Sequence, residues 1–245
     1  MMDPLNFKGP LLKAERAEHH IGHLEKIFAA YKDANLEAFN NKRFGSRGEE
    51  LRTFGLPLPD HTPTVLGDAL HNLRASLDHA YCILVEANGG QVNEYTKFPF
   101  AKKHGARNDL KASIEGHAKN GNAPSRAVID YIFDTIQPFV DGAGADLVAI
   151  HVLDIADKHM ILLPTHHRTE VVNVTIGGNT LNVVTEGFGT GMLLINTPAP
   201  NNPNSKMTVT PCFGRGQPLE WQPIIPTLKR LHARVVETLA ALSTI

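Results

Sequence analysis

The chain has 245 residues, a formal net charge of −1 and 42% hydrophobic residues. This hydrophobic share excludes a disordered chain, and the charge balance argues against a protein with a broad basic surface for nucleic acid. Two cysteines exclude a disulfide framework, and Cys82, within the apolar run "YCILV", is predicted to be a buried free thiol. Without an apolar signal segment or a membrane-length apolar run, we expect a cytoplasmic protein that does not enter a membrane.

The N-terminal part of the chain predicts helices separated by turn-rich sequence. The first helix begins near Pro10, a favourable first-turn residue, and continues beyond Tyr31. Residues 40–60 are rich in turn formers, so short strands or extended chain fit there better than helix. A second helix begins at "HTPT", where Thr62 can act as the cap, and ends near "EANGG".

Residues 91–123 are predicted to form a polar, partly basic loop that "FPF" anchors at one end. Two further helices follow this loop. One is capped by Ser125 and ends before Pro138, because proline cannot continue a helix. The other covers about residues 146–159.

The hydrophobic period then changes from that of a helix to that of a strand. The segments "EVVNVTI", "TLNVVTE", "MLLIN" and "KMTVTPCF" predict a four-stranded antiparallel meander over about residues 168–214. A closing helix is expected from about Pro226 to Leu242. We therefore predict one α+β domain over residues 1–245, in which a helical bundle (about 10–165 and 220–243) carries the meander.

The helix "LGDALHNLRASLDHAY" is amphipathic in an unusual way. Its leucines fall on one side of a helical wheel. The rest of the wheel carries histidine, aspartate, asparagine and arginine in place of the glutamate and lysine typical of a solvated face. These polar residues are Asp68, His71, Asn72, Arg74, Asp78 and His79.

The helix of residues 146–159 has the complementary pattern, because it is apolar on most of its surface. His151, Asp154 and Lys158 form a narrow polar stripe, with Asp157 beside it. A helix that is apolar nearly all round is buried, and an unpaired buried charge is too costly to keep. We therefore predict that this stripe and the polar face of the leucine helix lie opposite one another or border one cavity.

Three interpretations of the polar face remain open from the residues alone. It is a solvated surface with an Arg74–Asp78 pair at i, i+4, a buried polar network between helices, or a catalytic or ligand-binding face. An Asp154–Lys158 pair with a purely structural role is the corresponding alternative for the second helix.

The segments "LGDALHNLRASLDHAY", "FPF", "IQPF" and "LDIADKH" make residues 60–165 resemble a set of uncharacterised bacterial proteins with a "GDALHNLRSALDH" helix and a "DKH" segment. The leucine helix is also similar to the signature helix of the HEPN superfamily, helical proteins of which many are metal-independent ribonucleases. Their signature is an arginine followed, after a few residues, by a histidine, and Arg74 and His79 match it.

The resemblance implies a HEPN-like bundle that cleaves RNA through the substrate's own 2′-hydroxyl at a homodimer interface, without metal or other cofactor. His79 would act as general acid or base and Arg74 would stabilise the phosphorane, with Asn72 and Asp78 orienting them. The implied substrate contacts are His71, Asp154, Asp157, Lys158 and His159, together with Lys102, Lys103 and Arg107 in the basic loop.

Two other classes of function stay open. The first is a metal-binding helical protein, with ligands drawn from Asp68, His71, His79, His151 and Asp154. The second is a non-enzymatic ligand-binding or interaction protein, in which polar helices fix the register of a dimer. It is favoured by the near-neutral charge and by Ala75, which follows Arg74 where the HEPN pattern favours a polar residue.

Overall fold

The structure is a computed structural model that describes residues 6–43, 51–54, 56–101, 106–119, 123–159, 163, 165–176, 179–187, 192–195 and 206–245. This part of the chain divides into two compact units, formed by residues 1–21, 65–163 and 226–245 and by residues 22–64 and 164–225. Helices α1 (Lys8–Arg43) and α2 (Thr62–Ala87) contribute to both units. The single domain expected from the sequence therefore remains a prediction.

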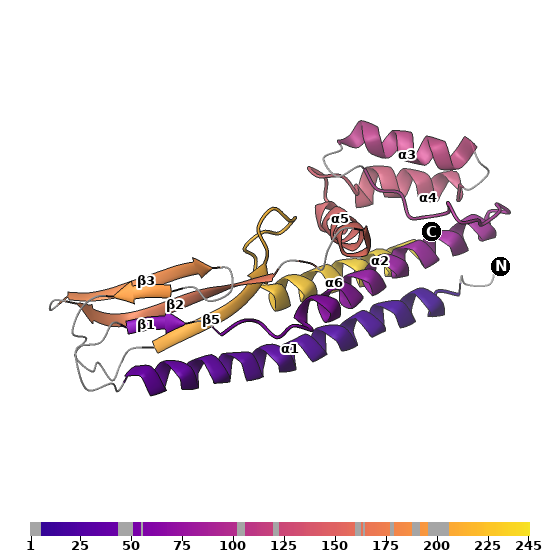
Figure 1. The fold of residues 1–245 in the computed structure, drawn as a ribbon. Coiled ribbons are helices and arrows are strands. Elements are labelled where there is room, and N and C mark those ends of the chain that lie inside the picture. Colours follow the sequence, from indigo (N-terminus) through magenta and orange to yellow (C-terminus); the bar gives the residue numbers. More distant parts are fainter. Residues whose placement is uncertain are drawn as a thin grey trace. The chain divides into compact units, whose positions relative to one another are not determined.

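The first unit is helical and contains most of α2 (Figure 1). Its other elements are α3 (Arg107–Lys119), α4 (Arg126–Tyr131), the π-helical turn η1 (Ile132–Ile136), α5 (Ala145–His159) and most of α6 (Ile224–Leu242). Leu66, Leu70, Leu73 and Leu77 of α2 are fully buried, as their spacing on the wheel predicts. Helix α5 is also largely buried on its apolar sides, so both helices are built into one core.

The helix ends agree only in part with the sequence predictions. Ser125 caps α4 as expected, because its Oγ accepts a hydrogen bond from the Val128 N–H at 3.4 Å. Thr62 does not cap α2: it lies inside the helix, and its buried Oγ1 has no hydrogen-bond partner in the described part of the chain.

The prediction of a polar loop was wrong for residues 107–119, which form α3. Leu110 and Ile114, one turn apart, are buried and give this polar segment an apolar edge. Asp109 also accepts a hydrogen bond from the Ala106 N–H at 3.0 Å, which secures the first turn. Two apolar residues and one cap were enough to form a helix in a segment whose composition is that of a loop.

The second unit contains the strands, as the change of period predicts. They are β1 (Leu51–Phe54), β2 (Thr165–Ile176), β3 (Asn179–Gly187), β4 (Met192–Ile195) and β5 (Lys206–Phe213). Strands β2 and β3 form the expected antiparallel hairpin, and β5 pairs with the other edge of β2 (Figure 1).

The pairing of β4 differs from a meander. It pairs with β1, Thr53 opposite Leu193, in a separate two-stranded sheet. The short strand expected within residues 40–60 is therefore present. It pairs with β4, which in a meander would pair with strands next to it in the sequence. The mostly helical α+β character is confirmed. No helix in the described part of the chain combines the length and the apolar character that spanning a bilayer requires.

Candidate functional site

Helices α2 and α5 meet along a row of polar contacts spaced about one helical turn apart, which we call the seam. The contacting pairs are Gly67 with Asp157, His71 with Asp154, and Arg74 with His151. The numbers rise along α2 as they fall along α5, so the two helices run antiparallel here. The prediction that the two polar stripes lie opposite one another is confirmed.

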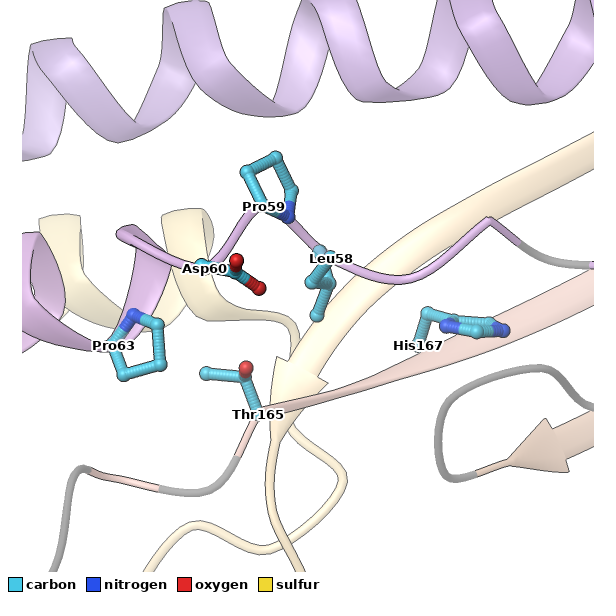
Figure 2. Close-up of a pocket in the computed structure, with 6 residues that line it drawn as sticks. All are labelled: Leu58, Pro59, Asp60, Pro63, Thr165 and His167. Atoms are coloured by element: carbon cyan, nitrogen blue, oxygen red, sulfur yellow. The ribbon is translucent and has the colours of Figure 1, made fainter.

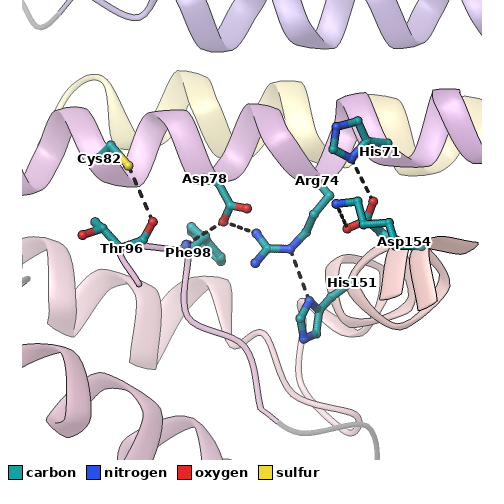
Figure 3. A network of polar contacts seen from close by, with 9 residues as sticks. His71, Arg74, Asp78, Cys82, Thr96, Phe98, His151 and Asp154 are labelled. Carbon is teal, nitrogen blue, oxygen red and sulfur yellow. Dashed lines mark hydrogen bonds and ion pairs between the residues drawn. The ribbon is translucent and has the colours of Figure 1, made fainter. Parts of the chain in front are cut away.

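Arg74 is at the more buried end of the seam (Figure 3), where only 5% of its side chain is exposed. It forms an ion pair with Asp78, whose Oδ1 also accepts a hydrogen bond from the Phe98 N–H at 2.8 Å. Its Nε donates to His151 Nδ1 at 3.2 Å, and its Cζ lies 4.3 Å from the centroid of the Phe100 ring. The guanidinium is thus held by a carboxylate, an imidazole and an aromatic face at once.

His151 acts as an acceptor in this cluster. Its ring stacks on Phe100 with centroids 4.6 Å apart and planes inclined by 4°. Burial, reinforced by the positive charge of Arg74, lowers the pKa of His151 to about 4. The ring is therefore neutral at pH 7. Because Nδ1 accepts the Arg74 hydrogen bond, the ring proton is on Nε2.

The ion pair itself is shaped by burial. Burial lowers the pKa of Arg74, which is opposed chiefly by Asp78, and the guanidinium stays protonated because its ordinary value is so high. Burial likewise raises the pKa of Asp78, against the opposing effect of Arg74 and of the Phe98 N–H. Asp78 therefore depends on Arg74 to remain charged in this position.

The other end of the seam is open to solvent. The buried Asp154 carboxylate lies 3.0 Å from His71 Nδ1 through Oδ1 and accepts a hydrogen bond from Lys158 Nζ at 2.9 Å through Oδ2. The side chains of His71 and Lys158 are 45% and 42% exposed. With Nδ1 turned to the carboxylate, Nε2 is the nitrogen of His71 that can exchange a proton with a ligand.

Asp157 lies against the α2 backbone one turn before His71. A Cβ at position 67 would be 2.4 Å from Asp157 Oδ2, so this contact requires Gly67. Asp157 Oδ1 is buried and has no hydrogen-bond partner among the described residues. Burial, with the negative charges of Asp154 and Asp68, raises the pKa of Asp157.

The structure does not bring the proposed signature pair together. His79 is exposed on α2 and is outside the seam, whereas Arg74 is buried in it. Asn72 Nδ2 donates to the backbone oxygen of Asp68 at 2.8 Å, so its amide is engaged within α2 and does not orient Arg74. Arg107 belongs to α3 and pairs with Asp134 at 2.7 Å. Lys102, Lys103 and the side chain of His159 lie outside the described residues.

Sequence reasoning missed the aromatic residues of the seam. Phe98 and Phe100 come from "FPF", which predicts only the anchor of a loop. In the structure Phe98 provides a backbone donor for Asp78, and Phe100 provides a stacking face for Arg74. The only signal for this role in the sequence is that two aromatic residues flank a proline within a polar stretch. Cys82 is a free thiol as predicted, but it is only half-buried, with Sγ 3.7 Å from the Thr96 carbonyl oxygen.

Within the described ranges, no group of three or more histidine, cysteine, aspartate or glutamate side chains is arranged to hold a metal ion. The geometry of that part of the chain therefore gives no support to the metal-binding alternative. Comparison of the chain with protein-family models, with curated proteins and with solved structures gave no match. Function is therefore inferred from the chemistry of the seam and from the resemblance of α2.

Proposed function

We propose that the open end of the seam is the general acid–base site of a metal-independent ribonuclease. One observation carries the proposal: the buried Asp154 carboxylate holds His71 and Lys158 side by side while both remain accessible. A histidine oriented by a carboxylate, next to a fixed cation, is a combination suited to proton transfer at an anionic substrate.

RNA cleavage by its own 2′-hydroxyl needs three things from a protein. A base must take the 2′-hydroxyl proton, an acid must protonate the departing 5′-oxygen, and a positive charge must stabilise the phosphorane. His71 Nε2 is placed to exchange the proton, with Asp154 stabilising the imidazolium that forms. Lys158 supplies a cation next to this pair. His71 and Lys158 would thus supply one proton-transfer group and the positive charge within one chain.

Arg74 has a positioning role in this proposal. With 5% of its side chain exposed and both Asp78 and His151 bound to it, it joins the helices that carry His71 and Asp154. The exposed His79 remains available to a second copy of the chain. A HEPN-like bundle that forms a homodimer, with Arg74 and His79 completing a shared site, is the version of the proposal that the resemblance implies.

The test is cleavage of single-stranded RNA in the presence of EDTA. We expect His71→Ala to lower the rate by about a hundredfold or more, which is typical for loss of a general acid or base. Asp154→Asn should also lower it strongly. His19→Ala, which changes an exposed histidine of α1, is the matched control and should behave as wild type.

His79→Ala separates the two versions of the site. If His71→Ala is inactive and His79→Ala is active, the chemistry belongs to the open end of the seam. If His79→Ala is inactive and His71→Ala is active, the homodimer site is correct. Wild-type protein that cleaves no faster than the His71→Ala, His79→Ala double variant would refute both.

A second candidate function is a non-enzymatic interaction protein. The observation that favours it is the burial of Arg74 in contacts that a purely structural cross-link would also make. Under this candidate, we expect neither cleavage of RNA nor RNA binding that weakens steeply with salt. A filter-binding titration at two salt concentrations distinguishes it from the ribonuclease.

A further inference from the structure

The second unit contains a pocket of about 230 Å³ (Figure 2). It is lined by Leu58, Pro59, Asp60, Pro63, Thr165 and His167, all within that unit. Its volume is below the roughly 300–1,000 Å³ of pockets for drug-sized ligands. A ligand that fits it is therefore small.

The chain segment that forms one wall is held in place without a ligand. The Leu56 N–H donates to the Asn35 Oδ1 at 2.8 Å, and the Tyr31 hydroxyl donates to the Leu56 carbonyl at 2.8 Å. Asn35 is fully buried, and its Nδ2 is bound to the Tyr31 carbonyl of the same helix. Pro59 and Pro63 restrict the backbone that follows. A wall fixed in this way loses little conformational entropy when a ligand binds.

His167 gives the pocket a polar side chain. It is 3% exposed, and none of the described residues forms a hydrogen bond with its imidazole, although its ring lies 6.3 Å from that of Tyr31. Burial lowers the pKa of His167, so the ring is neutral at pH 7 and offers one donor and one acceptor. Because the ring lines the pocket, this donor and this acceptor are available to a ligand there.

Asp60 decides which ligands are favoured. Among the lining residues it is the charged one, and in Figure 2 its carboxylate and the Thr165 hydroxyl lie on the same side of the pocket, between Pro63 and Leu58. A carboxylate accepts hydrogen bonds and repels anions, so phosphate and carboxylate ligands are disfavoured. Leu58 provides apolar surface between Asp60 and His167, and the two prolines provide apolar surface around Asp60 (Figure 2).

We propose that this pocket binds a small planar molecule whose N–H donors, of the amidine or N–H heterocycle kind, face Asp60, while His167 hydrogen-bonds with its other end. The pocket and the seam belong to different units, so the proposal stands independently of the ribonuclease proposal.

Three probes with the same phenyl ring and different head groups test this proposal: benzamidine, benzamide and benzoate. Titration of the full chain, followed by two-dimensional amide NMR, should show binding in the order benzamidine, benzamide, benzoate. The shifted amides should include those of Asp60, Thr165 and His167. Asp60→Asn should weaken benzamidine binding by about tenfold or more, because it removes a charge-assisted hydrogen bond.

Glu94→Gln is the matched control, since it removes an exposed carboxylate in the first unit and should leave binding unchanged. His167→Phe, checked for folding by circular dichroism, should weaken binding of 4-hydroxybenzamidine, whose hydroxyl lies opposite the amidine, more than binding of benzamidine, which has no hydrogen-bonding group at that end. Equal binding of benzoate and benzamidine would overturn the proposal, as would unchanged benzamidine binding in Asp60→Asn. Absence of shifts at the lining residues at millimolar benzamidine would overturn it too.

Discussion

The two ends of the seam use the same kinds of residue and differ in access to water. At one end the Phe98 N–H binds Asp78, the Phe100 ring lies against Arg74 and His151, and the guanidinium is nearly inaccessible. About one turn away, His71 and Lys158 bind a buried carboxylate but keep almost half of their surface exposed. The first group, which is shielded from water, acts as a structural cross-link between the two helices. The second group is open to water, so it keeps the capacity for chemistry.

The largest effect should come from breaking the covered end. Arg74→Ala leaves Asp78 without its cation and should destabilise the fold by about 3 kcal/mol. Arg126→Ala removes a solvent-exposed i, i+4 pair with Asp130 and should change stability by less than about 0.5 kcal/mol. Urea unfolding of both variants measures the difference. Equal losses would mean that the covered end is no more structural than a surface ion pair.

His151 should make the covered end sensitive to acid. Its pKa is about 4 in the folded chain and 6.5 ordinarily, so the unfolded chain binds the proton first as the pH falls. Stability is therefore complete above pH 6.5 and falls through the window down to about pH 4, by roughly 2–3 kcal/mol. His151→Asn, whose Oδ1 can still accept from Arg74, should reduce this slope. Urea midpoints at pH 7.5 and 4.5 check it, and an unchanged slope would contradict the assignment.

Asp157 should have the opposite pH dependence at the open end. Because its pKa is raised, the folded chain holds this proton more tightly than the unfolded chain does. The stability contribution is complete below the ordinary value of 3.8 and is lost as the pH rises through the folded value. Asp157→Asn should thus be slightly more stable than wild type at pH 7, by less than about 1 kcal/mol, because solvent screens this partly exposed carboxylate. The two proteins should converge in acid, and a less stable variant at pH 7 would disprove this.

The smallest effect on stability should come from Lys158. Its ion pair with Asp154 is exposed on the lysine side, so Lys158→Ala should cost about 1 kcal/mol or less. Under the ribonuclease proposal, the same variant should cleave RNA about tenfold more slowly or worse. Lys111→Ala, at an exposed pair with Glu115, provides the control. A variant with full activity would remove Lys158 from the site.

The facing stripes were predictable because both helices have strong periodicity. The all-round apolar surface of residues 146–159 required buried partners for His151 and Asp154, and the leucine helix offered them. Access to solvent was not predictable in the same way. It depends on Phe98 and Phe100, which contact Asp78 and Arg74 from a loop whose path the local sequence does not specify. For this reason the sequence identified the residues of the seam but not which end is open.

The sheet shows the same division between local and distant information. Strands β2 to β5 could be predicted from the change of period within their own segments, and the β2–β3 hairpin from the turn between its strands. The pairing of β4 with β1 joins segments far apart in the chain, and a period of two contains no information about the partner. Helix α3 was missed because two buried residues outweighed a loop-like composition.

The close contact between Gly67 and Asp157 makes the residue choices at positions 67 and 157 depend on each other, both in evolution and in protein design. Because the Asp157 carboxylate occupies the space where a Cβ would be, a larger residue at position 67 is compatible only with a different side chain or rotamer at position 157. The two positions should therefore covary among chains that share this pair of helices. In a double-mutant cycle, Gly67→Ala and Asp157→Ala should show strong non-additivity, since the second change removes the obstacle that the first one meets.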